Sequence, residues 1–181
     1  MTGISGATWR QPEDLFGDFG AAEVIGTLLA GDVAFSPTAL AGCLQGFGWT
    51  SVPHAGDVAT PNPWKWEKDG QLSFIISAGD ETFIEFVFGI IPPGADEFES
   101  MVNSEYEAVV AEVHPLTRNL IASLASGGAR LSSTAECPDD AVNFIDQECW
   151  AADDFHLSIG IAHSDETVPV LFMAVLRRGA N

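Results

Sequence analysis

The run Thr82–Ile91, TFIEFVFGII, constrains the fold of this chain more than any other segment. It is rich in β-branched and aromatic residues, which favour β-strands. Side chains alternate between the two faces of a strand, so Phe86 and Phe88 share one face with two isoleucines. A strand face of that kind must be covered, which predicts a sheet packed against a second layer.

Three further runs extend this pattern. Residues 72–76 (LSFII) come before Thr82–Ile91 across a short polar segment, and the two runs predict an antiparallel hairpin. Residues 155–162 (FHLSIGIA) and 168–176 predict a second hairpin. Pro169 stands near the start of the last run, where a strand tolerates proline.

A first helix is predicted over residues 37–47. Ser36 is a suitable N-cap, Pro37 fits the first helical position, and apolar residues then recur at helical spacing until Gly48. Trp49 is expected to pack just beyond this helix. A weaker helix signal begins at Pro12, where two nearby glycines reduce the helix propensity.

A longer helical pattern runs from Phe98 to Leu124, after two acidic residues that suit a helix start. Pro115 is expected to kink or split this helix, and Gly127-Gly128 to end it. Its apolar face makes it the natural cover for the sheet.

We therefore predict one α+β domain over residues 1–181. It has two layers, with a mostly antiparallel sheet of two hairpins and with helices packed on one face. Residues 51–71 carry three prolines and two glycines, which predicts a loop. Residues 131–150 fit either a strand or a short helix, and both alternatives stay open.

Charge limits the partners of the chain. Seven Lys plus Arg against 26 Asp plus Glu give a net charge of -19. Nucleic acids and anionic membranes are bound through Lys and Arg, so neither is expected as a partner. An acidic surface attracts basic partners, although the same charge also serves solubility. The sequence shows no apolar run of about 18 residues and no secretory signal, so we expect a cytoplasmic location.

The three cysteines, Cys43, Cys137 and Cys149, lack the spacing of a zinc site. In a reducing compartment they are expected to be buried free thiols. A Cys137–Cys149 bridge is the open alternative.

The sequence offers no catalytic motif. The histidines His54, His114, His156 and His163 show no metal-ligand spacing, and the most ligand-like cluster, His163-Ser164-Asp165-Glu166, stands in an expected turn. A phosphate-binding glycine loop and a G-x-S-x-G element are both missing. Carboxylates are too abundant to mark a catalytic pair. We therefore expect a binding module without catalytic residues, cofactor or metal.

The segment NPWKWEKDG is the best candidate for a binding surface. Between Arg10 and Arg118 the basic side chains are Lys65 and Lys68, and both stand beside tryptophans, which are enriched at interface hot spots. The competing interpretation is that the rings are buried and the lysines only neutralise nearby acids. The candidate partner-binding residues are Trp64, Lys65, Trp66, Glu67, Lys68, Asp69 and Gly70.

The layout resembles that of a known family. It combines SPTALAGCLQGFGW (36–49), a central hairpin, a long helix, ECW (148–150) and the closing hairpin FHLSIGIAHSDETVPVLFMAVLRR (155–178). This layout resembles small acidic immunity proteins of actinobacterial toxin systems, and among them the immunity factors of secreted necrotizing toxins that are NAD glycohydrolases. The resemblance implies a non-enzymatic inhibitor that blocks the NAD site of a toxin in the producing cell.

Given this resemblance, we expect a folded toxin domain as partner, bound 1:1 by a chain that is monomeric when free. Lys65 or Lys68 would occupy the place of the cationic nicotinamide as a charge mimic. An acidic secretion chaperone or adaptor and an inhibitor of a basic nuclease toxin are the two alternatives.

Overall fold

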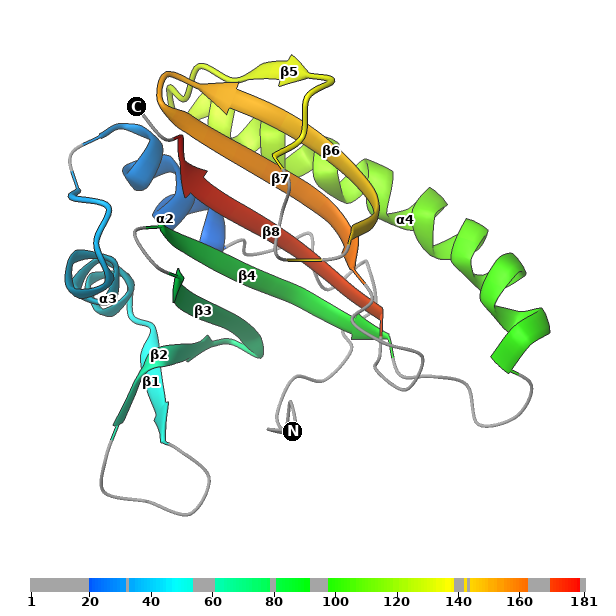
Figure 1. The fold of residues 1–181 in the computed structure, drawn as a ribbon, viewed down its shortest axis with the longest axis horizontal. Coiled ribbons are helices and arrows are strands. Elements are labelled where there is room, and N and C mark those ends of the chain that lie inside the picture. Colours follow the sequence, from blue (N-terminus) through cyan, green and yellow to red (C-terminus); the bar gives the residue numbers. More distant parts are fainter. Residues whose placement is uncertain are drawn as a thin grey trace.

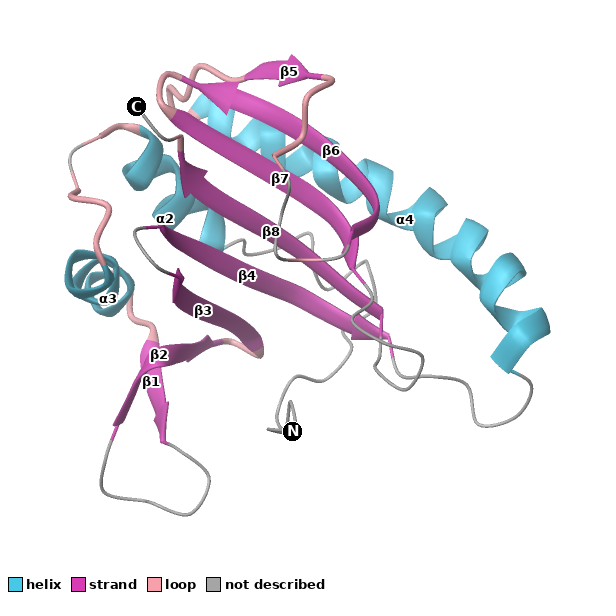
Figure 2. Cartoon of the chain, in the orientation of Figure 1, coloured by secondary structure: helices cyan, strands magenta, loops and turns pink. Residues whose placement is uncertain are grey.

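The computed structural model describes residues 20–31, 33–53, 61–78, 81–91, 98–138, 142, 144–162 and 170–179. Within this part, eight strands form one antiparallel sheet and three helices accompany it (Figures 1 and 2). The α+β class is therefore confirmed. The elements are α2 (Gly20–Leu29), α3 (Pro37–Gly46), β1 (Thr50–Pro53), β2 (Pro61–Lys68), β3 (Gln71–Ala78), β4 (Glu81–Ile91), α4 (Phe98–Ser126), β5 (Ser132–Thr134), β6 (Phe144–Ala152), β7 (Phe155–Ala162) and β8 (Val170–Arg178).

The two predicted hairpins form the centre of the sheet. The strand order is β1-β2-β3-β4-β8-β7-β6-β5, so β3 and β4 lie beside β8 and β7. The register pairs Leu72 with Val87 in the first hairpin and Leu157 with Leu176 in the second. The predicted sheet of two hairpins was nevertheless too small. Two further strands flank these hairpins on each side, β1 and β2 on one side and β6 and β5 on the other.

The helices cover one face of this sheet, as predicted. Phe86 is fully buried and meets the ring of Trp49 edge to face, with 5.9 Å between the ring centroids. Leu120 of α4 and Ile25 of α2 belong to the same buried cluster. Figure 1 shows α2 and α4 behind the sheet, with α4 running behind β6 and β7.

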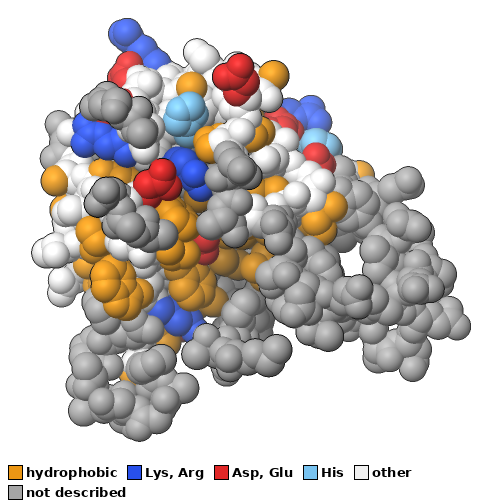
Figure 3. All heavy atoms as spheres, in the orientation of Figure 1, with side chains coloured by type: hydrophobic (Ala, Val, Ile, Leu, Met, Phe, Trp, Pro, Cys, Tyr) orange, Lys and Arg blue, Asp and Glu red, His pale blue; other side chains and the backbone are white. Residues whose placement is uncertain are grey.

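The opposite face of the sheet carries a second buried cluster. Its buried members are Leu72, Phe83, Val87, Ala162, Met173 and Val175. The central strands are therefore apolar on both faces, which accounts for the nearly continuous apolar run in β8. Figure 3 shows hydrophobic side chains of this face gathered over β3 and β4.

The helix predictions have three outcomes. Helix α3 begins at Pro37, with Ser36 Oγ accepting a hydrogen bond of 3.5 Å from Ala39 N, as predicted. Helix α4 runs through Pro115 without splitting and ends before the two glycines. The predicted helix start at Pro12 lies outside the described residues. None of the described helices is both long and apolar enough to cross a membrane.

Helix α2 was missed. Its buried side chains Ala21, Val24, Ile25 and Leu28 follow the helical spacing that the search used. The glycines Gly20 and Gly26 lower the helix propensity of this segment. The helix is stabilised by burial of this face against α4 and the sheet, which offsets its low helix propensity.

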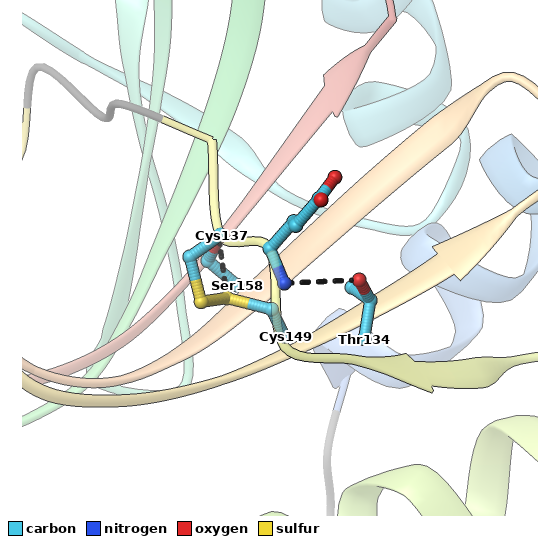
Figure 4. Close-up of a disulfide and its surroundings, with 5 residues drawn as sticks. Thr134, Cys137, Cys149 and Ser158 are labelled. Atoms are coloured by element: carbon cyan, nitrogen blue, oxygen red, sulfur yellow. Dashed lines mark hydrogen bonds between the residues drawn. A yellow bond between two sulfur atoms is a disulfide. The ribbon is translucent and has the colours of Figure 1, made fainter.

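Residues 131–150 were left open between strand and helix, and their described part contains β5 and most of β6. Cys137 and Cys149 are joined by a disulfide, with 5.6 Å between their Cα atoms, so the prediction of free thiols is wrong for this pair. Cys43 is free and half-buried, and burial raises the pKa of its thiol, which favours the unreactive protonated form. The bridge ties the segment after β5 to the sheet (Figure 4).

Candidate functional site

The predicted binding segment is a strand and a turn. The loop prediction for residues 51–71 is wrong for its described part, and residues 54–60 lie outside the described residues. Strands β1 and β2 and the start of β3 lie within it. The turn Asp69-Gly70 links β2 to β3, with φ angles of 50° and 78°. Asp-Gly favours such positive φ values and is a strong hairpin signal, which the prolines of this segment obscured. Proline is tolerated here because β1 is the edge strand and the prolines of β2 come before its ladder with β3, which begins at Lys65.

Strands β2 and β3 have equal lengths, but they are paired only over the four residues next to their turn. The ladder between β2 and β3 runs from Lys65 to Lys68, whereas the ladder between β1 and β2 continues as far as Pro61. The far part of β2 is therefore paired with β1, and Figure 1 shows the two strands leaving the sheet together at the lower left. We call residues 50–53 and 61–68 the β1–β2 ribbon.

The ribbon places its two tryptophans in different surroundings. The β1–β2 ladder is irregular between them, because Trp66 is paired with Ser51 and Pro61 with Pro53. Trp66 is 7% exposed and belongs to the main core, whereas Trp64 is 46% exposed. Among the described residues, Trp64 and Ile145 are the large apolar side chains with high exposure.

The two lysines lie on opposite faces of β2, so they do not form one cationic site. Lys65 is opposite Phe74, which packs on the second cluster. Lys68 faces the helices, and its side chain rests against Gly20 at the start of α2. The contact is so close that a Cβ atom at Gly20 would lie only 3.1 Å from Lys68 Nζ. Of the remaining predicted residues, Glu67 shares the face of Lys65 and accepts a hydrogen bond at its carbonyl from Thr50 Oγ1, at 3.2 Å.

A second region of interest is a pocket of about 330 Å³ on the face opposite the helices. A row of paired residues crosses three strands there: Phe83 of β4 is opposite Arg177 of β8, which is opposite His156 of β7. The Arg177 guanidinium lies 5.5 Å from the centroid of the Phe83 ring. We call this site the Arg177 pocket. It is lined by Glu81, Thr82, Phe83, Glu136, Cys137, Pro138, His156, Arg177, Arg178 and Gly179.

Arg178 is engaged at the side of this pocket. Its guanidinium forms an ion pair with Asp154 and lies 5.7 Å from the centroid of the Phe155 ring. The hydrogen bond from Arg178 holds the pKa of Asp154 below its usual range. His156 differs, because its Nδ1 atom is buried and has no hydrogen-bond partner within the described structure.

Cys137 and Pro138 form one wall of the pocket, and the disulfide of Cys137 to Cys149 supports this wall. The Ser158 hydroxyl lies 3.7 Å from Cys149 Sγ. A bridged sulfur carries no proton, so the hydroxyl is the donor. Glu136 N donates a hydrogen bond of 3.1 Å to Thr134 Oγ1, which fixes the backbone just before the bridge.

The histidines do not form a catalytic cluster in the described part of the chain. His114 of α4 lies between two carboxylates of β6, with Nδ1 2.9 Å from Glu148 Oε1 and Nε2 3.7 Å from Asp146 Oδ2. These three half-exposed side chains connect α4 to the edge of the sheet. The described residues contain no group of side chains arranged to hold a metal ion. His54 and the His163 cluster lie outside the described residues.

Sequence reasoning missed the Arg177 pocket, although a signal for it exists. The predicted hairpin of residues 155–162 and 168–176 ends beside two consecutive arginines, and antiparallel pairing brings them to His156. Comparison of the chain with protein families, with curated proteins and with solved structures finds no match.

Proposed function

We propose that this chain is an immunity protein that binds a folded toxin domain through the β1–β2 ribbon and blocks its active site. The observation that supports the proposal best is Trp64, which is 46% exposed on a ribbon that leaves the sheet. Exposed tryptophan is costly to leave in water and is enriched at interface hot spots. A ribbon of this shape suits insertion into a concave surface.

The charge of the chain fits a basic toxin surface. A net charge of -19 steers a positively charged partner toward the chain and accelerates association. The proposed partner binds 1:1, in the cytoplasm of the producing cell, and the free chain is a monomer.

An NAD glycohydrolase is the toxin class that we propose, because its site accommodates a cationic nicotinamide. Within the ribbon, Lys65 is the candidate for the charge mimic. Lys68 is a poor candidate, because its side chain rests against Gly20 of α2. Binding of Trp64 near the rim and of Lys65 in the cleft would keep NAD out by occupation of its site.

The test begins with the neighbouring gene, which is expected to encode a large secreted protein with a C-terminal toxin domain. That domain is expressed from an inducible promoter, with and without this chain, while growth and cellular NAD are measured. The proposal predicts that the chain restores both. Growth arrest that persists despite stable co-expression of the chain would contradict it.

The two alternatives give different results in the same experiments. A secretion chaperone is expected to elute as a dimer of about twice 19.2 kDa and to bind an unfolded segment of its partner. A monomer that binds the folded domain supports the immunity proposal. Rescue of growth from a toxin that degrades nucleic acid and leaves NAD unchanged would assign the partner to the basic nucleases.

A further inference from the structure

We propose that the disulfide of Cys137 to Cys149 is a redox switch, which a dithiol reductant opens while the sheet stays folded. Opening releases residues 135–138, which we call the strap, from the face of the sheet. In the oxidised chain, Glu136, Cys137 and Pro138 of the strap line the Arg177 pocket. The inference does not depend on the proposed function, because β5, which leads into the strap, and the β1–β2 ribbon lie at opposite edges of the sheet.

The strap is held mainly by the bridge. Within the described residues, its specific links to the rest of the chain are the disulfide and a hydrogen bond of 3.1 Å from Glu136 N to Thr134 Oγ1. Ala135 and Glu136 are exposed, and Cys137 and Pro138 are half-buried, so the strap adds little to the core. A segment with few buried contacts opens locally at low cost in free energy. The strap is therefore expected to open when its covalent link is cut.

The other end of the bridge is anchored without it. Cys149 lies in β6, which is paired with β7 from Phe144 to Ala152 and with β5 on its other side. The neighbouring Trp150 is 7% exposed and belongs to the main core. Strand pairing and burial hold β6 in the sheet whether the bridge is closed or open. Reduction should therefore release the strap alone.

The two cysteines differ in access, which determines the order of the reaction. Cys137 is half-buried and Cys149 is 3% exposed, so a reductant reaches Cys137 more easily. A thiolate of the reductant attacks Cys137 Sγ and forms a mixed disulfide, and the electron pair of the broken bond passes to Cys149 Sγ. The second thiol of the reductant then attacks the reductant's own sulfur in the mixed disulfide and releases Cys137. Both cysteines take up protons, and the reductant leaves as its own disulfide.

Ser158 supports Cys149 as the leaving group. Its hydroxyl lies 3.7 Å from Cys149 Sγ and is the donor of this hydrogen bond (Figure 4). Ser158 is 2% exposed, so little water competes for the contact. A hydrogen bond to an ionised acceptor is stronger than one to a neutral acceptor, so the hydroxyl stabilises the thiolate as it forms. A better stabilised thiolate leaves faster.

The test compares the oxidised chain with the same chain reduced by dithiothreitol in the absence of denaturant. Alkylation after quenching should count one thiol before reduction, from Cys43, and three after it. Hydrogen exchange in residues 132–138 is expected to become at least about tenfold faster, because the strap and the adjoining β5 lose their covalent link to β6. Exchange in residues 155–162 should stay unchanged. Reoxidation should restore the slow exchange.

Three variants separate the contributions to the switch. Ser158→Ala is expected to slow reduction by dithiothreitol at least about threefold, because the leaving thiolate loses its hydrogen bond. Ser73→Ala is the matched control, since Ser73 is also a buried serine but lies in β3, and it should leave the rate unchanged. Thr134→Val removes the hydrogen bond to Glu136 N. Its strap should stay protected in the oxidised chain and open on reduction.

Three outcomes would overturn the inference. In the first, exchange in residues 132–138 is the same in the oxidised and the reduced chain. In the second, reduction speeds exchange in residues 155–162 as much as in the strap, which would make the bridge a support of the whole fold. In the third, dithiothreitol reduces the chain only after denaturation. Failure of the chain to rescue a toxin-expressing cell concerns the ribbon and leaves this inference intact.

Discussion

Trp64 and Trp66 lie two residues apart in one strand, yet Trp66 is 7% exposed and Trp64 is 46% exposed. The ladder between β2 and β3 starts at Lys65, so Trp66 lies in the body of the sheet and Trp64 in the free part of the ribbon. Strand alternation decides which way a side chain points, but the neighbouring elements decide whether anything covers it. We therefore propose different roles for the two rings, one in stability and one in recognition.

The largest expected effect separates these two roles by stability. Trp66→Ala removes a ring from the main core and is expected to lower the free energy of unfolding by about 3–5 kcal/mol. Trp64→Ala is expected to cost clearly less, because 46% of this side chain is already exposed to water. Urea denaturation of both variants measures the difference. Equal losses would show that Trp64 is also part of the core.

The second prediction concerns the end of the sheet that lies away from the ribbon. Replacement of both Cys137 and Cys149 by serine opens a bridge with a sequence separation of 12, which is expected to cost about 3 kcal/mol. Hydrogen exchange should increase around residues 132–138 and stay unchanged in the ribbon. Cys43→Ser is the control, and thiol titration of the native chain should find one free cysteine. Faster exchange in the ribbon would mean that the two regions are coupled.

The third prediction separates the two lysines by their faces. Lys65→Ala is expected to weaken inhibition of the toxin about tenfold, because a charged contact in a cleft is lost. Lys68→Ala should leave inhibition nearly unchanged, because this side chain rests against Gly20. Inhibition constants of the two purified variants provide the measurement. Unchanged inhibition by Lys65→Ala removes the charge mimic from the account, and it leaves Trp64 as the anchor.

The smallest expected effect is a dependence of stability on pH at Asp154. Arg178 lowers the pKa of this carboxyl in the folded chain, so the ionised form favours folding. The contribution is present above the unfolded pKa of about 4, and it is lost as pH falls through the lower folded value. The difference in Tm between the native chain and Asp154→Asn should therefore be small at pH 7 and vanish at strongly acidic pH. A difference in Tm that stays the same from pH 7 to strongly acidic pH would show that the ion pair does not cause it.

Sequence patterns predicted the centre of this fold better than its edges. The runs around Phe86 and Leu157 are apolar on a strand face, so hydrophobic periodicity identified all four central strands. The edge strands β1, β2, β5 and β6 are short, polar or rich in proline, and their pairing depends on neighbours that are distant in sequence. Helix α2 was missed for a related reason, since its stability comes from burial.

The candidate sites were predictable to different degrees. Tryptophan and lysine in NPWKWEKDG pointed to the ribbon, but the sequence alone could not show which ring is covered, because that depends on where the β2–β3 ladder stops. The same alternation argument, applied to a strand in place of a loop, would have placed Lys65 and Lys68 on opposite faces. The Arg177 pocket needed the β7–β8 register together with the β4–β8 register, and the second pairing joins segments about 90 residues apart.

The central claim is that the toxin binds the β1–β2 ribbon. Hydrogen exchange of the chain, free and bound to the toxin domain, tests it most directly. We predict slower exchange of the backbone amides in residues 61–70 on binding, with unchanged exchange in residues 132–138, and loss of that protection at the same toxin concentration in Trp64→Ala. Protection elsewhere in the chain, with none in residues 61–70 of a saturated complex, would contradict the claim.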